Sequence, residues 1–168
     1  MSASTPKSPV ALVTGASSGI GRATALAFAR QGYDLLLAAR RTEAGESLVR
    51  EIRSLGREAL FVRTDVSKEA EVAALVERGL AKFGRLDAAF NNAGVEGPTF
   101  IGLEQHDHAS YTEVFEINVF GVLCSMKHEI PALLASGGGA IVNTASVAGL
   151  IGFPGMSVYT ASKHAVVG

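Results

Sequence analysis

Two residues near the end of the sequence, Tyr159 and Lys163, have the types and the spacing of an acid–base pair. On a helix, residues four apart share one face, with Cβ atoms roughly 5–6 Å from each other. A free phenol has a pKa of about 10, and a neighbouring ammonium lowers such a pKa because it stabilises the phenolate. The pair therefore fits proton transfer near neutral pH. The alternative is an ordinary polar pair on an exposed helix surface.

Two polar residues earlier in the sequence fit the same chemistry. Ser146 ends a predicted strand, and its hydroxyl can donate a hydrogen bond to an oxygen on which negative charge develops. Asn118 lies within a predicted helix, where asparagine is a poor helix former. We expect its side chain to hold a water molecule in a proton path through the lysine. The simpler interpretations are a turn serine and an asparagine that satisfies a backbone carbonyl.

A glycine-rich segment follows the first apolar run, with Gly15, Gly19 and Gly21 in a G-x-x-x-G-x-G pattern. Glycine permits positive φ in a tight turn and lets the backbone approach a phosphate closely. The N-terminus of the following helix adds free N–H groups and a positive dipole end. The order strand, turn, helix therefore predicts a site for nucleotide phosphates, although a tight turn alone would also explain the glycines.

The elements that must position these residues alternate between strand and helix. Short apolar runs predict strands, and apolar residues at helical spacing predict helices. Strands are expected at Val10–Thr14, Tyr33–Ala39, Glu58–Val62, Leu86–Asn92 and Ala140–Ser146, with helices before Gly32, from Thr42 to Gly56, after an N-cap at Ser67, from Asp107 to Leu134 and from Ser157. This alternation predicts an α/β protein with a doubly wound, mostly parallel, Rossmann-like sheet of about five strands. In such folds ligands bind at the carboxyl ends of strands.

Composition narrows the class of protein. Of the 168 residues, 48% are hydrophobic and 18% are charged, with a net charge of −1. The low share of charge suits strands buried on both faces, and no basic cluster is long enough to follow a nucleic-acid backbone. There is no apolar run of membrane-spanning length, and the single cysteine, Cys124, is expected to be a buried small hydrophobe. We expect a cytoplasmic protein without metal, with a flexible tail over residues 1–8 and one dinucleotide-binding domain over residues 9–168.

Several short motifs occur together and in a fixed order: TGASSGIG, the pair Asp65–Val66, NNAG at residues 91–94, and YTASK, with Asn118 and Ser146 between the last two. This set resembles the compact branch of the short-chain dehydrogenase/reductase family, and the resemblance extends from Val10 to Gly168. It implies an oxidoreductase that transfers a hydride between a nicotinamide cofactor and a carbonyl or secondary alcohol.

The resemblance also implies roles for single residues. The catalytic tetrad would be Asn118, Ser146, Tyr159 and Lys163. The cofactor would be bound by Gly15, Ser17, Gly19, Ile20, Gly21, Arg40, Arg41, Asp65, Val66, Asn91, Ala93, Gly94, Tyr159 and Lys163. Within this set, the glycine-rich turn would line the pyrophosphate, the Asp65–Val66 pair would contact the adenine, and Asn91 with the turn after it would flank the adenosine ribose. Lys163 would also hold the nicotinamide ribose.

The choice between NADP and NAD is expected to depend on the end of the second strand. An acidic residue there binds the ribose 2′-hydroxyl of NAD, whereas an arginine accommodates the 2′-phosphate of NADP. The sequence has Ala39 followed by Arg40 and Arg41, so NADP(H) is expected over NAD. Ser18 stands where many NADP-dependent members of the family have a basic residue. The alternative is that the two arginines belong to a solvated loop.

Two segments are expected to face the substrate, Val95–His108 and the apolar Val147–Met156, which favour a small carbonyl or alcohol on an apolar skeleton. Family members continue beyond the tyrosine–lysine helix, so we expect the chain to be the leading part of a longer protein that forms a homodimer or homotetramer. The alternative is a 168-residue product that serves as a non-catalytic nucleotide-binding or interaction module.

Overall fold

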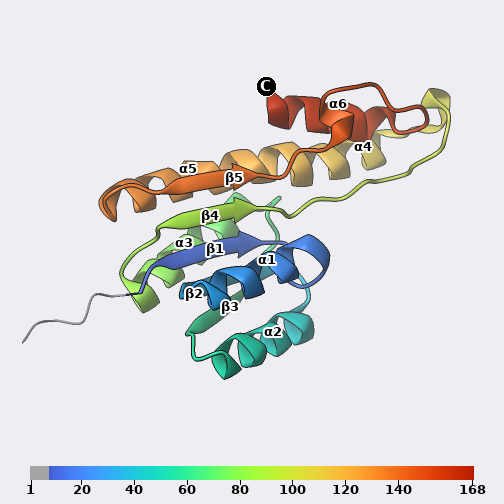
Figure 1. Cartoon of the computed structure of the whole chain (residues 1–168). Coiled ribbons are helices and arrows are strands. Elements are labelled where there is room, and N and C mark those ends of the chain that lie inside the picture. Colours follow the sequence, from blue (N-terminus) through green and yellow to red (C-terminus); the bar gives the residue numbers. More distant parts are fainter. Residues whose placement is uncertain (1–7) are drawn as a thin grey trace, which may run out of the picture.

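The computed structural model describes residues 8–168, and its centre is a five-stranded parallel sheet (Figure 1). The predicted flexible tail over residues 1–8 lies almost entirely outside the described residues. The strand order is β3-β2-β1-β4-β5, and the strands are β1 (Val10–Thr14), β2 (Asp34–Ala39), β3 (Ala59–Arg63), β4 (Ala88–Asn91) and β5 (Ala140–Asn143). Strand order reverses between β1 and β4, which is where ligands bind in doubly wound sheets. The predicted fold class is confirmed.

Six α-helices accompany the sheet in the described part of the chain: α1 (Gly19–Arg30), α2 (Thr42–Ser54), α3 (Glu69–Phe83), α4 (His108–Phe115), α5 (Gly121–Ala135) and α6 (Ser157–Val167). The first two cover one face of the sheet, and α3 and α5 cover the other. Strand β2 shows how the sequence produces this layering. Leu35 and Leu37 pack with α1 and α2, while Leu36 packs on the opposite face. A run of consecutive apolar residues suits a parallel strand that is buried on both faces.

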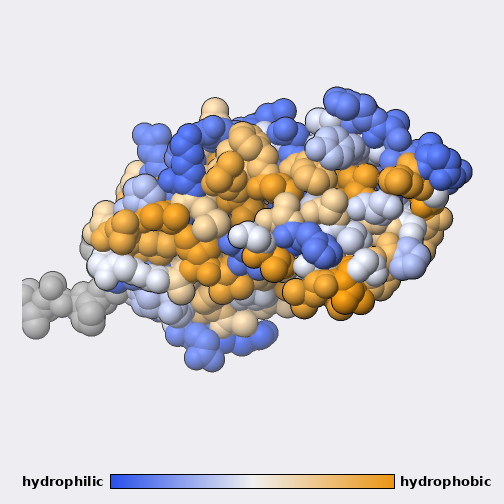
Figure 2. Space-filling view, turned by 90° about the horizontal axis from the view of Figure 1, so that it is seen from above, coloured by the Kyte–Doolittle hydropathy of each residue, from blue (hydrophilic) through white to orange (hydrophobic). Residues whose placement is uncertain are grey.

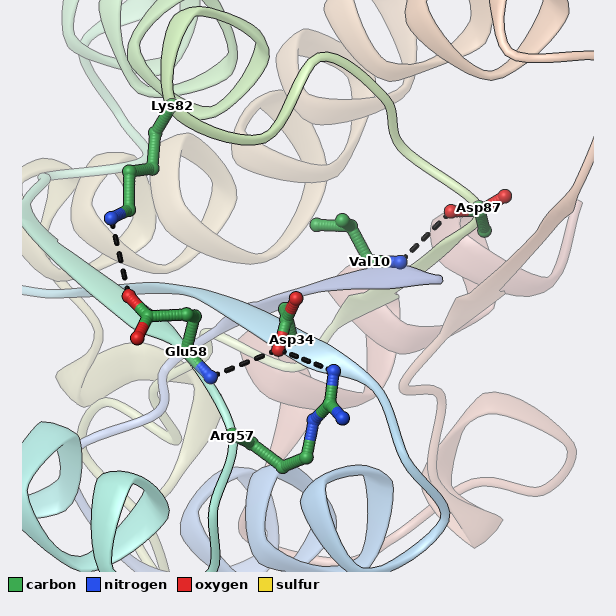
Figure 3. A network of polar contacts seen from close by, with 6 residues as sticks. All are labelled: Val10, Asp34, Arg57, Glu58, Lys82 and Asp87. Atoms are coloured by element: carbon green, nitrogen blue, oxygen red, sulfur yellow. Dashed lines mark hydrogen bonds and ion pairs between the residues drawn. The ribbon is translucent and has the colours of Figure 1, made fainter. Parts of the chain in front are cut away.

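Polar contacts connect the amino-terminal ends of neighbouring strands in two pairs, β1 with β4 and β2 with β3 (Figure 3). The Asp87 carboxylate accepts a hydrogen bond of 2.8 Å from the Val10 backbone nitrogen. Asp34 accepts hydrogen bonds from the Arg57 side chain at 2.7 Å and from the Glu58 backbone at 2.9 Å. Burial opposes ionisation of Asp87, but its contacts with Arg85 and Val10 outweigh that cost and lower its pKa. This end of the sheet is held by ion pairs and hydrogen bonds, which leaves the carboxyl ends for a site.

The segment from α4 to α5 was predicted as one helix over Asp107–Leu134, and the structure divides it. Asp107 is the N-cap, as its carboxylate accepts a hydrogen bond of 2.8 Å from the Ser110 backbone nitrogen. A π-helical turn, Glu116–Phe120, separates α4 from α5. Such turns contain i→i+5 hydrogen bonds and often occur at functional sites. The hydrophobic pattern did not predict the turn, because α-helical and π-helical hydrogen bonds differ by only one residue in span.

Some predicted boundaries were wrong. Lys68 rather than Ser67 is the N-cap of α3, because the Ser67 hydroxyl donates to the Asp65 carboxylate at 2.8 Å. The fifth strand ends at Asn143 instead of Ser146, since the chain then leaves the sheet and forms a 3₁₀ turn at Val147–Gly149. The fourth strand is likewise shorter than predicted. Cys124 is buried, as expected. Among the described residues no helix has the length and apolarity that crossing a membrane requires.

Candidate nucleotide and catalytic site

A pocket of about 290 Å³ lies at the carboxyl ends of the strands, and we call it the strand-end pocket. Of the predicted cofactor residues, Gly15, Ser17, Arg40, Arg41, Asp65, Val66, Ala93 and Gly94 line it. The lining also includes Ser18, Thr64, Asn92 and Ile117, which the sequence analysis did not assign to cofactor binding. Gly19, Ile20 and Gly21 lie at the start of α1 outside this lining, and Ile20 is 65% exposed.

The glycine-rich turn lies close against the loop that follows β4. Gly15 has a φ of 65°, and a Cβ at this position would lie 2.9 Å from the Ala93 backbone. A Cβ on Gly21 would overlap the Gly15 carbonyl oxygen and lie 2.7 Å from the Asn92 side chain. The Thr14 hydroxyl accepts hydrogen bonds from the backbone nitrogens of Asn92 at 3.0 Å and of Ala93 at 3.1 Å. The turn therefore needs glycine for both conformation and space.

Arg41 lies beside the glycine-rich turn in the wall of the strand-end pocket. Its guanidinium donates to the Ser17 hydroxyl at 3.0 Å and to the Ser18 hydroxyl at 2.6 Å. Arginine and two hydroxyls thus line the same corner of the pocket at the end of β2. The alternative of a solvated loop fits Arg41 only in part, because its side chain is exposed to solvent but hydrogen-bonded to both serines. A guanidinium in this setting can bind a phosphate through two parallel hydrogen bonds.

Asp65 supplies a carboxylate to another wall of the strand-end pocket. Burial opposes its ionisation, but hydrogen bonds from Ser67 and the positive charge of Arg40 outweigh this effect, so its pKa is lowered. The carboxylate accepts from the Ser67 backbone nitrogen at 3.1 Å as well as from the hydroxyl at 2.8 Å. Asp65 is thereby a fixed acceptor that remains ionised at neutral pH.

The side chain of Asn91 does not face this pocket. Its amide donates to the Glu129 carboxylate at 2.9 Å and to the Asn143 side chain at 3.0 Å, which places it between β4, β5 and α5. Glu129 is fully buried on α5. Burial raises the pKa of Glu129 to about 7, and the hydrogen bond from Asn91 offsets only part of this effect. The sequence analysis did not identify this acid, since an isolated glutamate in an amphipathic helix is usually a surface residue.

Asn118 is completely buried in the middle of the π-helical turn. Its side-chain oxygen accepts from the Val95 backbone nitrogen at 2.9 Å, and its amide donates to the Val95 carbonyl at 2.8 Å. The second amide hydrogen bonds to the Ser162 hydroxyl at 3.0 Å. Both hydrogens therefore bind protein atoms, and the bond to the Val95 carbonyl fits the simpler interpretation of an asparagine that satisfies a backbone carbonyl. The side chain also connects the loop after β4 with α6, and the water molecule in a proton path stays a prediction.

Lys163 lies between Tyr159 and the strand-end pocket. Its ammonium donates to the Thr144 carbonyl at 2.7 Å and lies 5.8 Å from the centre of the Tyr159 ring. A Cβ on the pocket residue Gly94 would lie 3.8 Å from the same nitrogen. The side chain is almost fully buried, and burial lowers the pKa of Lys163. One cation is thus close to both the phenol and the wall of the pocket.

Ser146 begins the 3₁₀ turn that follows β5, and this turn packs against α6. The Ser146 hydroxyl accepts a hydrogen bond of 3.2 Å from the Ala148 backbone nitrogen. Within residues 8–168 this is its one hydrogen bond, so its hydrogen is available for donation. Gly149 allows the close packing, because a Cβ there would lie 2.7 Å from the Lys163 carbonyl. The serine is therefore presented beside the helix that carries Tyr159 and Lys163.

The two segments expected to face the substrate meet at their backbones. The Ile101 nitrogen donates to the Gly155 carbonyl at 3.3 Å. Apolar side chains on these segments are exposed, namely Phe100, Leu103, Val147, Leu150, Ile151 and Phe153. Figure 2, seen from above relative to Figure 1, shows apolar surface across the side of the molecule that carries α6 and β5. This rim suits contact with an apolar molecule.

Known proteins resemble the chain along nearly its whole length. A family described as "short chain dehydrogenase" matches residues 9–168. The cyclohexanol dehydrogenase of Acinetobacter sp. (strain SE19) is 44% identical over 159 residues, which cover 95% of this chain and 63% of that protein.

Solved structures of two oxidoreductases are also similar to the chain. A short-chain dehydrogenase/reductase from Burkholderia phymatum in complex with NAD is 44% identical, with a TM-score of 0.90, covering 96% of this chain and 57% of that one. Actinorhodin polyketide ketoreductase with NADPH is 36% identical, with a TM-score of 0.89, covering 95% and 61%. The chain thus spans less than two thirds of the length of these relatives.

Proposed function

Because the chain belongs to the short-chain dehydrogenase family, we propose that it is an oxidoreductase that transfers a hydride between NADP(H) and a carbonyl or secondary alcohol. The observation that carries this proposal is the position of Lys163. Its ammonium lies 5.8 Å from the Tyr159 ring and beside Gly94 in the wall of the strand-end pocket. An acid–base residue, the cation that activates it and a nucleotide pocket therefore adjoin one another.

The proposed chemistry assigns Tyr159 as the acid–base residue. Reduction of a carbonyl adds a hydride to carbon and a proton to oxygen, and the nicotinamide supplies the hydride when it is bound. The Tyr159 hydroxyl donates the proton to the substrate oxygen, and the Lys163 ammonium stabilises the phenolate that remains. The Ser146 hydroxyl donates a hydrogen bond to the same oxygen as its negative charge develops. In the direction of alcohol oxidation, the phenolate accepts the proton.

Arg41 supports NADP(H) over NAD(H) in this proposal. The guanidinium stands at the end of β2 with the Ser17 and Ser18 hydroxyls, forming a donor-rich corner for a 2′-phosphate. Ala39 offers no carboxylate to bind a 2′-hydroxyl or to repel a phosphate. Relatives of known structure hold either nucleotide, so the family alone leaves the choice between them open.

We infer a small apolar ketone or secondary alcohol as the substrate class. The exposed apolar rim over Val147–Met156 supports this inference, as does the similarity to a cyclohexanol dehydrogenase. Assembly into a homodimer or homotetramer remains a prediction from the sequence, as does a cytoplasmic location. The exposed Leu123 and Ile130 on α5 support association through that helix.

The test uses the chain and its Tyr159→Phe variant. NADPH and NADH affinities are measured by fluorescence, and oxidation of NADPH is followed with a panel of cyclic ketones. We expect tighter binding of NADPH than of NADH, and turnover that disappears in the variant while its NADPH affinity is retained. Turnover that survives in the variant would contradict the role of Tyr159. NADPH binding without turnover of any ketone would support the alternative of a non-catalytic nucleotide-binding module.

A further inference from the structure

Ser162 occupies a position that the proposed chemistry does not explain. It lies on α6 directly before Lys163 and is completely buried. Its hydroxyl donates a hydrogen bond of 2.7 Å to the Tyr159 carbonyl and accepts one of 3.0 Å from the Asn118 amide. The single hydrogen of this hydroxyl is therefore already used. Ser162 cannot pass a proton onward without breaking a bond inside its own helix.

The hydrogen bonds of Asn118 extend this contact to the pocket. Asn118 binds both the nitrogen and the carbonyl of Val95, and Val95 lines the strand-end pocket. The preceding residue in the π-helical turn, Ile117, also lines the pocket. A continuous path of hydrogen bonds thus runs from the pocket wall through Asn118 and Ser162 to the backbone of Tyr159.

We propose that Ser162 is a positioning residue that fixes the catalytic helix α6 relative to the pocket wall at Val95. This inference rests on the proposed function, since it concerns how Tyr159 and Lys163 meet a bound nucleotide. Ser162 is the α6 side chain that receives the Asn118 hydrogen bond, and it lies in the sequence between Tyr159 and Lys163, the two residues whose placement matters. Removal of the Ser162 hydroxyl leaves a buried amide hydrogen of Asn118 without a hydrogen-bond partner, which is unfavourable. We expect α6 or the π-helical turn to shift so that this hydrogen finds another partner.

The two halves of a dinucleotide should respond differently to such a shift. The adenosine half would contact the corner around Arg41 and Asp65, whereas the side-chain hydrogen bonds of Ser162 within residues 8–168 go to Asn118 and Tyr159. The nicotinamide half would contact Lys163, the next residue on the same helix turn. Loss of Ser162 is therefore expected to weaken binding of the whole dinucleotide and to leave binding of its adenosine half unchanged.

The experiment compares Ser162→Ala with the unaltered chain, using NADPH and 2′,5′-ADP as probes. We expect about a fivefold to tenfold loss of NADPH affinity, as for removal of one buried hydrogen-bond partner, and no change for 2′,5′-ADP. Ser125→Ala is the matched control, because Ser125 is a buried serine on α5. It should leave both affinities unchanged. An equal loss for both probes, or no loss for either, would overturn the positioning role.

A second measurement needs no nucleotide and so separates this inference from the proposed function. The Val95 amide donates its hydrogen bond to Asn118 and not to Ser162, so its hydrogen exchange reports how a change at Ser162 passes along the path. Ser162→Ala should accelerate exchange at Val95 by about tenfold, and Ser162→Cys, which keeps a weak donor and acceptor, by less. If Ser162→Ala does not fold, the cysteine variant decides. Unchanged Val95 exchange refutes the inference, whereas failure of the unaltered chain to bind NADPH or 2′,5′-ADP refutes only the proposed function.

Discussion

At the scale of single residues, Glu129 is a buried carboxyl group without a compensating cation among its described hydrogen-bond partners. Its side chain bonds to the Asn91 amide, while one oxygen of each of these two residues has no partner within residues 8–168. A proton on Glu129 would provide a donor at this position. Burial raises its pKa to about 7, so the group titrates near neutral pH.

This titration predicts that the free energy of unfolding falls as the pH rises. Between the ordinary value of 4.5 and about 7, the unfolded chain loses the proton of Glu129 while the folded chain keeps it. The loss is of order 3 kcal/mol, at about 1.4 kcal/mol per pKa unit. Glu129→Gln has no carboxyl group to titrate, so it should lack this loss of unfolding free energy. The variant should be more stable than the original chain at pH 8, with a much smaller difference at pH 5. Chemical denaturation across this range measures the effect.

The control for this prediction is Glu113→Gln, which changes an exposed glutamate on α4. Asp65 and Asp87 have lowered pKa values, so both stay ionised throughout the window and do not contribute to the slope. A difference between Glu129→Gln and the original chain that does not vary with pH would contradict the assignment.

At the scale of elements, the turn between β1 and α1 determines the shape of the strand-end pocket. Gly21→Ala would place a methyl group against the Gly15 carbonyl oxygen and 2.7 Å from the Asn92 side chain. Because these atoms belong to the turn and to the loop after β4, the helix must move away. We expect a loss of roughly 1–3 kcal/mol in stability and a weaker affinity for NADPH. Ala23→Ser, on the exposed side of the same helix, is the control. Full NADPH affinity in Gly21→Ala would contradict this account.

The elements themselves were largely predictable, because apolar runs and helical spacing are strong local signals. The consecutive leucines in β2 predicted a strand buried on both faces, and glycines predicted where helices end. The motif residues predicted where the pocket lies. The π-helical turn, the orientation of Asn91 and the partners of Asn118 were not predictable. Each depends on contacts between segments far apart in the sequence, such as the hydrogen bond between Asn118 and Ser162.

At the scale of the whole molecule, β5 is an edge strand with an uncovered face. Val142 lies beside Phe90 of β4 in the register of the sheet, and Phe90 packs against the core formed with α1 and α2. Val142 itself is 56% exposed, since neither helix reaches it. Exposed apolar edge strands are templates for association with another chain.

We therefore expect the 168-residue chain to self-associate as its concentration rises. Val142→Lys should reduce this association, because it places a charge on the uncovered face at the edge. Leu55→Lys is the matched control, since Leu55 is an exposed apolar residue at the end of α2 on another side of the molecule. Sedimentation velocity over a range of concentrations measures the effect. A chain that stays monomeric throughout, or equal effects of both variants, would contradict it.

The π-helical turn at Glu116–Phe120 contains one residue more than a regular α-helix would, and this residue sets the rotation and translation of α4 relative to α5. Deleting one residue there would restore regular α-helical bonding, and the helix would look more ideal. It would also turn α4 by about 100° and displace it by about 1.5 Å relative to α5. Ile117 and Asn118 could then keep their places beside α5 only if α4 lost its packing against α6. In this protein, an irregular backbone lets two consecutive helices pack on the rest of the molecule with different helical phases.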